Sequence, residues 1–485
     1  MLFDKPIFFI FLALVTVLYW RLRWRSQNVL LLAASYFFYG WWDWRFLSLL
    51  WISTVVDFYL ARWISQAQSP ARRRLCLITS LVMNFGFLGF FKYFNFFIDS
   101  FEHVARFVGL GDSAMPLLRI LLPPGISFYT FQAVAYIVDV YNERQKPAAS
   151  LVDYSLFISL FPHLIAGPIQ RPSHLLPQVQ APRAYDSGKF FDGLMLIVTG
   201  LFRKCVIADN CALLANGVFS GGFGELNAPL VLLGIYAFAW QIYGDFSGYS
   251  DIARGSAQLL GFHFMVNFRQ PYLATSLRDF WRRWHISLST WLRDYLYIAL
   301  GGNRGSEART SMNLFTTMLL GGLWHGANWV FVIWGAIHGF GLMVGRWLSE
   351  KGVTGKEVAA TGDIGSSFTT LWLKRILLFH FVCFGWLFFR ASSIHEAFNW
   401  LGGLAHFGWK SQYIPAALFL LLFTVPLFWL DLRMERCEEE YPFQKLALTN
   451  EKASYQWRVA VAGGALLIIA LLAGSNPNAF IYFQF

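Results

Sequence analysis

Apolar runs close to the length of a membrane-spanning helix recur along the whole chain. A helix needs about 20 mostly apolar residues to cross a bilayer. The candidate runs are 6–20, 28–41, 46–63, 75–91, 117–140, 154–165, 191–207, 229–243, 314–347, 371–389, 414–430 and 459–473. Several are short and 314–347 is long enough for two spans. The sequence therefore predicts an all-α integral membrane protein with about ten to twelve spans plus re-entrant pieces.

Composition and charge agree with a membrane protein. The 485 residues are 56% hydrophobic and 14% charged, with a formal charge of +11. The cations fall in clusters, at 21–25, 72–74 and 144–146, rather than on one continuous face, so a nucleic-acid partner is not expected. These clusters follow the first, third and fifth runs, which places them in the cytoplasm by the positive-inside rule. We expect a multi-pass protein in contact with membrane lipid, with its first run retained as a span.

Neither a repeat nor a low-complexity linker divides the chain. We expect a single polytopic domain over 1–485, with N-terminal helices in 1–116, a core at about 117–348 and C-terminal helices in 367–485. The five cysteines are scattered without a CxxC pair, and no zinc-ligand array occurs. Neither a metal site nor a permanently bound cofactor is therefore expected.

Two stretches rich in helix breakers interrupt the apolar runs. One is Pro123-Pro124-Gly125 and the other is 161–168, which contains Pro162, Gly167 and Pro168. Broken backbone at membrane depth is tolerated only where protein or a water-filled cavity surrounds it. These breaks predict an internal cavity.

The segment 277–296 has the spacing of one amphipathic helix. Its polar face carries Arg278, Arg282, His285, Ser289 and Arg293. Such a helix would lie on the cytoplasmic surface, or its cationic stripe around His285 would attract an anionic, phosphate-bearing donor.

A second histidine, His325, interrupts the long apolar run 314–347. A helix starting near residue 312 would carry it roughly 20 Å along its axis, past the middle of the bilayer. Gly321 and Asn328 would share its helical face. Ionisable residues at this depth usually serve function, although a structural histidine bonded to a neighbouring helix is the alternative. His338 and the other histidines are expected to be packing or surface residues.

Two carboxylates, Asp245 and Asp251, lie in an otherwise apolar setting. They could pair with arginines such as Arg282 and Arg283, orient a histidine, or carry protons. We favour ion pairing because arginines are plentiful. A transporter or flippase with a relay of His325 and these carboxylates remains the alternative from another functional class.

Taken together, these motifs resemble the membrane-bound O-acyltransferase family, and within it the alginate O-acetyltransferase branch. The matching stretches are 122–129, 161–168, 245–251, 280–295 and 319–328. The resemblance implies tilted helices around a central tunnel, with amphipathic cytoplasmic helices, His325 in the tunnel and His285 towards a cytoplasmic funnel. It also implies a bacterial inner-membrane enzyme that moves acetyl groups from cytoplasmic acetyl-CoA, as the donor substrate, to an exported polysaccharide. Its implied partners are a polysaccharide synthesis and export complex and a periplasmic serine-type (SGNH-like) acetyltransferase.

The residues suggest a mechanism for such a transfer. A buried neutral histidine can take the proton of an attacking hydroxyl, and we assign this role to His325. His285 would support donor binding or proton handling, Arg282 and Arg283 would attract the donor phosphates, and Asn328, Asp245 and Asp251 would support the site. Acceptors as different as alginate, cellulose and peptidoglycan fit this scheme, and the rival donor is a carrier-protein thioester, as in D-alanyl transfer.

Overall fold

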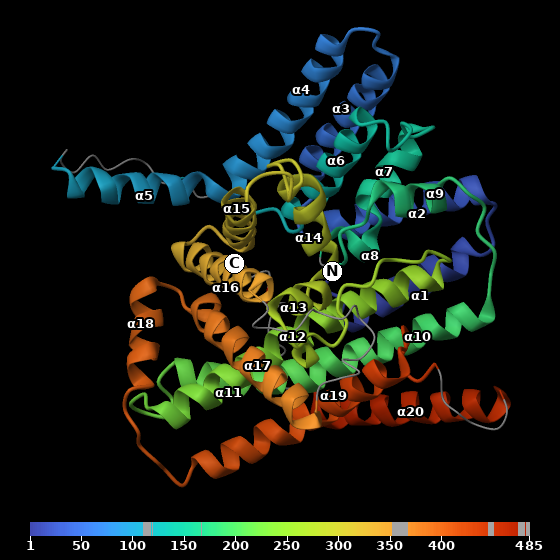
Figure 1. The fold of residues 1–485 in the computed structure, drawn as a ribbon. Helices are drawn as coiled ribbons and strands as arrows, with labels where there is room; N and C mark the ends of the chain where they lie inside the picture. The colour runs from blue at the N-terminus through green and yellow to red at the C-terminus, as the bar shows by residue number, and fades with distance from the viewer. Residues whose placement is uncertain are drawn as a thin grey trace. The chain divides into compact units, whose positions relative to one another are not determined.

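The computed structural model describes residues 1–109, 118, 120–165, 167–351, 367–444, 451–473 and 481. Every regular element in these ranges is a helix, which confirms the all-α prediction (Figure 1). The first residue of the predicted core, 117, lies outside the described residues, as do residue 116 at the end of the N-terminal region and residue 485.

Two compact units make up the chain. The first comprises Met1–Leu194 with Ala253–Met265, and the second comprises Met195–Ile252 with Val266–Phe485. Two of the three boundaries fall inside helices, α10 (Ser187–Leu201) and α12 (Ala228–Leu259), and the third, between Met265 and Val266, falls in a loop. Helices α10 and α12 therefore each contribute residues to both units.

The first unit is built from short and medium helices. They are α1 (Pro6–Tyr19), α2 (Trp24–Gly40), α3 (Phe46–Gln66), α4 (Pro70–Leu88), the π-helix η1 (Gly89–Tyr93), α5 (Phe94–Phe107), α6 (Ile126–Tyr141), α7 (Leu151–Ser159), α8 (Phe161–Leu164) and α9 (Pro172–Val179). Figure 1 shows α3 and α4 side by side. Between them the buried carboxylate of Asp57 accepts hydrogen bonds from Ser80, at 2.5 Å, and Asn84, at 2.8 Å. The buried polar groups of this helix pair thus satisfy one another.

The two helix breaks predicted from the sequence meet inside this unit. Gly125, at the start of α6, has φ +78°, and a Cβ there would overlap the carbonyl oxygen of Leu164 at the end of α8. Only glycine permits both this left-handed backbone and this close approach. The backbone at this break is therefore covered by protein, one of the two surroundings predicted for it, the other being a water-filled cavity.

The second unit contains the long C-terminal helices. Its elements after α10 are η2 (Phe202–Ala208), α11 (Asp209–Phe219), most of α12, η3 (Pro271–Leu273), α13 (Leu277–Arg283), α14 (Ile286–Trp291), η4 (Leu292–Tyr297), α15 (Glu307–His325), α16 (Trp329–Glu350), α17 (Phe368–Arg390), α18 (Ile394–Gly403), α19 (Tyr413–Cys437) and α20 (Glu451–Leu472). The apolar run 314–347 thus divides between α15 and α16, as its length suggested.

Glycines bring α15 and α16 into close contact. A Cβ at Gly322 would overlap the carbonyl oxygen of Phe331, and one at Gly335 would overlap that of Met318. Small residues let helix backbones approach closely where apolar burial gives little driving force, as in a membrane.

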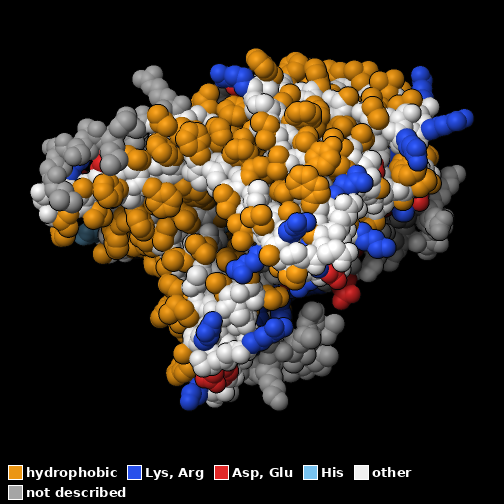
Figure 2. All heavy atoms as spheres, turned by 90° about the horizontal axis from the view of Figure 1, so that it is seen from above, with side chains coloured by type: hydrophobic (Ala, Val, Ile, Leu, Met, Phe, Trp, Pro, Cys, Tyr) orange, Lys and Arg blue, Asp and Glu red, His pale blue; other side chains and the backbone are white. Residues whose placement is uncertain are grey.

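The surface is strongly apolar. Figure 2 shows hydrophobic side chains over most of the visible face. Large side chains that are more than half exposed include Ile10, Leu14, Val82, Phe97, Leu377 and Leu422. Contact of such a surface with water is unfavourable, whereas contact with lipid chains carries no such free-energy penalty. The chain is a multi-pass membrane protein.

Seven helical stretches among the described residues are long and apolar enough to cross a membrane. They are Phe46–Gln66, Pro70–Phe107, Ala228–Leu259, Trp329–Glu350, Phe368–Arg390, Tyr413–Cys437 and Tyr455–Leu472. Seven is fewer than the predicted ten to twelve because some apolar runs do not form one long helix. The run 154–165 is divided between α7 and α8, and α1, the helix of the run 6–20, has only 14 residues.

Candidate active site

His325 is the last residue of α15, in the second unit. The helix ends there because Gly326 is extended, with φ −163°, and a Cβ at this glycine would overlap the ring of Phe331. The His325 side chain is only 3% exposed. The chain break after α15 therefore leaves the imidazole at a helix end inside the protein.

Aromatic rings surround His325. Its ring centroid lies 5.0 Å from those of Trp324 and Trp334 and 5.3 Å from that of Phe389. All three rings meet the imidazole edge to face. His285 is the neighbouring titratable side chain, with its ring centroid 6.5 Å away. The structure thus brings together the two histidines that the sequence singled out.

The single amphipathic helix predicted for 277–296 is wrong. Helix α13 ends at Arg283, Trp284 is extended with ψ 127°, and His285 takes a left-handed conformation with φ +43° before α14 begins. His285 is fully buried, not part of an exposed cationic stripe. A left-handed backbone is unfavourable for a residue with a Cβ, by about 1 kcal/mol or more, and such strain is often found at functional sites.

Asn267 fixes the orientation of His285. Its side-chain amide donates to Ser250 Oγ at 3.1 Å, and its side-chain oxygen accepts from the backbone N–H of Ser287 at 3.2 Å. These bonds identify the Asn267 atom next to His285 Nδ1, at 3.1 Å, as the carbonyl oxygen. Nδ1 must therefore carry the proton and donate it, which leaves the lone pair of the neutral ring on Nε2.

Burial also favours the neutral form of the His285 ring. His285 lies outside the seven membrane-spanning stretches, and loss of hydration lowers its pKa to about 3. A buried imidazole resists taking a charge because the protein interior solvates it poorly. His285 is therefore neutral near pH 7.

The two arginines proposed for donor binding have different surroundings. Arg283 pairs with Asp279 at 2.9 Å and with Glu435 at 2.7 Å, and the other oxygen of Glu435 binds Arg375 at 2.7 Å. This arrangement holds α13 to α17 and α19. Arg282 is exposed, and within the described ranges it has no hydrogen-bond or ion-pair partner. Arg282 is thus the arginine available to a ligand, whereas Arg283 already has two carboxylate partners.

Asp245 belongs to a buried charge cluster. Lys204 lies 2.8 Å from its carboxylate and 2.9 Å from that of Asp209. The backbone N–H of Ile481 also donates to Asp245, at 2.7 Å. One lysine therefore faces two carboxylates, and the C-terminal region contacts one of them.

Asp251 belongs to an adjacent cluster around Arg203. The guanidinium lies 2.8 Å from Asp251 and 3.8 Å from Asp431, which also accepts a hydrogen bond from the hydroxyl of Tyr243 at 2.8 Å. All four side chains are buried. Burial of these charges is tolerable because each has an opposite partner.

Ion pairing of Asp245 and Asp251 was predicted, but the suggested partners were wrong. The cations come from the π-helix η2, not from Arg282 and Arg283. Consecutive residues 203 and 204 both turn inward there, and π-helical turns are frequent at functional sites. These pairs fix helices in place.

Asn328 does not share a helical face with His325. It is the N-cap of α16, where its side-chain oxygen accepts from the Val330 N–H at 3.1 Å and its amide donates to the Ser392 carbonyl at 2.8 Å. Asparagine is a favoured N-cap because its side chain satisfies a free backbone N–H. The prediction failed because the helix break at residue 326 changes the phase. Asn328 is therefore the cap that starts α16.

Sequence reasoning missed one residue beside His285. Asn267 gave no periodic or motif signal, because its importance lies in contacts with residues 17 to 20 positions away. His338 was expected to be a packing or surface residue. It is fully buried, with its ring 4.8 Å from that of Trp334 and 5.3 Å from that of Trp281, so the packing alternative is confirmed. Among the described residues, no group of three or more His, Cys, Asp or Glu side chains is arranged to hold a metal.

Comparisons with known proteins identify the family of the chain. Residues 141–350 match the model of the membrane-bound O-acyltransferase family. The chain is 43% identical over 423 residues to a probable alginate O-acetylase of Pseudomonas aeruginosa, covering 86% of this chain and 77% of that protein. It is 36% identical over 436 residues to a peptidoglycan O-acetyltransferase of Helicobacter pylori, covering 83% and 80%. A teichoic acid D-alanyltransferase of Bacillus subtilis is 27% identical over 291 residues, covering 56% and 69%.

The relatives at 43% and 36% identity each align over most of this chain and over most of their own length. The similarity therefore extends beyond the residues that match the family model. The chain belongs to the membrane-bound O-acyltransferase family and is an O-acyltransferase of its alginate O-acetylase-like branch.

Proposed function

We propose that this protein transfers acetyl groups from cytoplasmic acetyl-CoA across the bacterial inner membrane for O-acetylation of an exported polysaccharide. The observation that carries the proposal is the proximity of two buried histidines, His285 and His325, whose ring centroids lie 6.5 Å apart within aromatic walls. The nature of the acceptor is supported by the similarity to an alginate O-acetylase and a peptidoglycan O-acetyltransferase, both named for polymers rich in sugar hydroxyls.

His325 acts as the general base in this proposal. It takes the proton of the acceptor hydroxyl as the oxygen attacks the thioester carbonyl. The new C–O bond forms, the C–S bond breaks, and the thiolate of coenzyme A leaves with a proton returned to it. The aromatic rings around His325 exclude water, which would otherwise compete as the acceptor.

His285 is a supporting residue in the same step. Its Nδ1 proton is held by Asn267, so Nε2 can accept a hydrogen bond or a proton from the reacting groups. Arg282 supplies an exposed positive charge for the donor phosphates, while Arg283 holds α13 to its neighbours. A periplasmic serine-type acetyltransferase and the polymer export complex are the proposed partners that receive the acetyl group.

The proposal is tested with full-length protein reconstituted in liposomes. Labelled acetyl-CoA is supplied on one side, and labelled product is measured against a His325→Ala variant of equal abundance. Transfer of label by the wild type, and its loss in the variant, are expected. No transfer from acetyl-CoA by well-folded wild type, in the presence of a polysaccharide acceptor and the periplasmic partner, would overturn the donor assignment.

A carrier-protein thioester is the second candidate donor. It is favoured by the similarity to a teichoic acid D-alanyltransferase, which covers a smaller part of the chain than the acetyltransferase relatives do. The same assay separates the two donors, because only the carrier route requires an acylated protein. Transfer from acetyl-CoA alone would show that no acylated carrier protein is required.

A further inference from the structure

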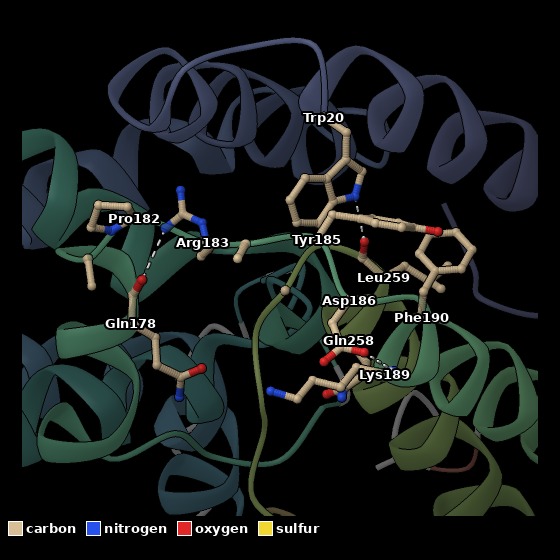
Figure 3. Close-up of a pocket in the computed structure, with 13 residues that line it drawn as sticks. Trp20, Gln178, Pro182, Arg183, Tyr185, Asp186, Lys189, Phe190, Gln258 and Leu259 are labelled. Atoms are coloured by element: carbon tan, nitrogen blue, oxygen red, sulfur yellow. Dashed lines mark hydrogen bonds between the residues drawn. The ribbon is translucent and has the colours of Figure 1, made fainter.

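A pocket in the first unit is lined by residues that the proposed acyl-transfer step does not use. Its volume is ≈ 380 Å³, and the loop between α9 and α10, the end of α1 and the last turn of α12 line it (Figure 3). Every lining residue belongs to the first unit.

Aromatic rings form one wall of this pocket. The ring of Tyr185 lies 5.4 Å from that of Trp20 and 5.7 Å from that of Phe190. The indole of Trp20 is held in place because its N–H donates to the Leu259 carbonyl at 3.0 Å. The wall is therefore partly preformed rather than created by a ligand.

Three polar groups on the lining can still bind a ligand. Gln258 is only 8% exposed, and its side-chain amide has no hydrogen-bond partner within the described part of the chain. The ammonium of Lys189 and the hydroxyl of Tyr185 are likewise without partners in those residues. An amide that faces a pocket and has no protein partner can donate to the oxygen of a bound ligand.

The charge at the pocket is positive. Arg183 bonds only neutral acceptors, including Asn28 at 2.6 Å and the Gln178 carbonyl at 3.0 Å, and no described carboxylate lies within 4.0 Å of it. One carboxylate lines the pocket, that of Asp186, and it accepts the backbone N–H of Lys189 at 3.0 Å, at the start of α10. The lining thus carries two cations and one anion. The adjoining turn adds further positive charge through its exposed arginines at 21, 23 and 25.

We propose that this pocket binds the phosphate group of a phosphate ester. The Lys189 ammonium, the Gln258 amide and the Tyr185 hydroxyl are donors of the kind that phosphate oxygens accept, and charge-assisted bonds are the strongest of these. The aromatic wall covers the less polar remainder of the ester. Two sources share this chemistry, an anionic phospholipid headgroup and a soluble nucleotide.

The test measures binding to purified full-length protein in neutral detergent by calorimetry. The lipid probe is dihexanoyl phosphatidylglycerol and the nucleotide probe is adenosine 3′,5′-bisphosphate. Their phosphate-free counterparts are dihexanoylglycerol and adenosine. Lys189→Ala and Gln258→Leu should each weaken the preferred phosphate ester by about tenfold, the usual effect of losing one charge-assisted or buried hydrogen bond. Lys410→Ala removes an exposed lysine of the second unit and is the matched control.

The probe that binds identifies the source. Tighter binding of the lipid assigns the pocket to the membrane, and tighter binding of the bisphosphate assigns it to a nucleotide. The proposal is overturned if neither phosphate ester binds better than its phosphate-free counterpart, or if both pocket variants bind as the control does. Because binding is measured without acetyl transfer, this outcome is independent of the proposed enzyme activity.

Discussion

The Nδ1 atom of His285 lies 3.1 Å from the side-chain oxygen of Asn267, and that oxygen also accepts a hydrogen bond from the backbone of Ser287. Asn267 therefore sets both the tautomer and the position of the imidazole. Because it acts through His285, it is a positioning residue for the proposed reaction.

Replacing Asn267 with aspartate should change the pH dependence of transfer. The new carboxylate would lie beside Nδ1 and stabilise the imidazolium, so the pKa of His285 should rise from about 3. Because the neutral ring is the proposed active form, the acid limb of the rate profile should move to higher pH. Rate against pH from 5 to 9 checks this, with Asn303→Asp as an exposed control. An Asn267→Asp profile of unchanged shape would show that His285 does not need to be neutral.

His285→Asn should make stability less sensitive to acid. Asparagine can donate to Asn267 and tolerates the left-handed backbone, but it does not titrate. The wild-type imidazole has a pKa of about 3 when folded and about 6.5 when unfolded, so the unfolded state binds the proton more readily between these values. Wild-type stability therefore falls as the pH decreases below about 6.5. Between pH 7 and pH 5 the free energy of unfolding of the wild type should fall by about 2 kcal/mol through this histidine, and the variant should lack this decrease.

Thermal unfolding of both proteins in detergent at pH 7 and pH 5 checks this expectation. The melting temperature of the wild type should fall more on acidification than that of the variant. Equal decreases would mean that other groups account for the acid sensitivity.

Much of the site could be predicted from the sequence, and the failures have physical causes. The lengths of the apolar runs predicted many of the helices and the division between α15 and α16, and the chemistry of the side chains singled out His285 and His325. The left-handed break at His285 was invisible because apolar spacing continues through it. Asn328 was wrongly placed on the same helical face as His325 for a related reason, because the helix ends between these two residues.

Pairings between distant residues were beyond reach of the sequence. Asp245 and Asp251 were expected to form ion pairs with arginines such as Arg282 and Arg283. The fold instead places Arg203 beside Asp251 and Lys204 beside Asp245. Asn267 was missed in the same way. Such contacts depend on tertiary structure, which local pattern does not determine.

Lys204→Met should destabilise the protein more than Asp245→Asn does. Lys204 faces both Asp209 and Asp245, so its loss leaves two buried carboxylates without this cation, a change that typically costs about 3–5 kcal/mol. Asp245→Asn leaves Lys204 paired with Asp209. Melting temperature and the monodisperse fraction in detergent should rank wild type first, Asp245→Asn second and Lys204→Met last. The reverse order of the two variants would contradict this view of the cluster.

Two glycines of α16 should respond in opposite ways to alanine. A Cβ at Gly335 would overlap the Met318 carbonyl oxygen, so Gly335→Ala should force α15 and α16 apart and cost about 1–3 kcal/mol. A Cβ at Gly345 would have no atom within 4 Å, and Gly345→Ala should be neutral or stabilising by up to about 1 kcal/mol. Thermal unfolding of the two variants tests the close packing directly. Similar melting temperatures would show that the helices are not held by this contact.

The most direct test of the acyl-transfer account is the activity of His325→Gln. Glutamine keeps a hydrogen-bonding side chain of similar reach but cannot accept a proton near neutral pH. If His325 is the general base, both His325→Gln and His325→Ala should lower acetyl transfer by a factor of about 10² to 10⁴, at unchanged protein abundance. The measurement is acetate released from the exported polymer per unit of correctly folded protein extracted in detergent. Near-normal acetylation by His325→Gln, with a loss in His325→Ala explained by lower abundance, would contradict the account and leave His325 a structural residue.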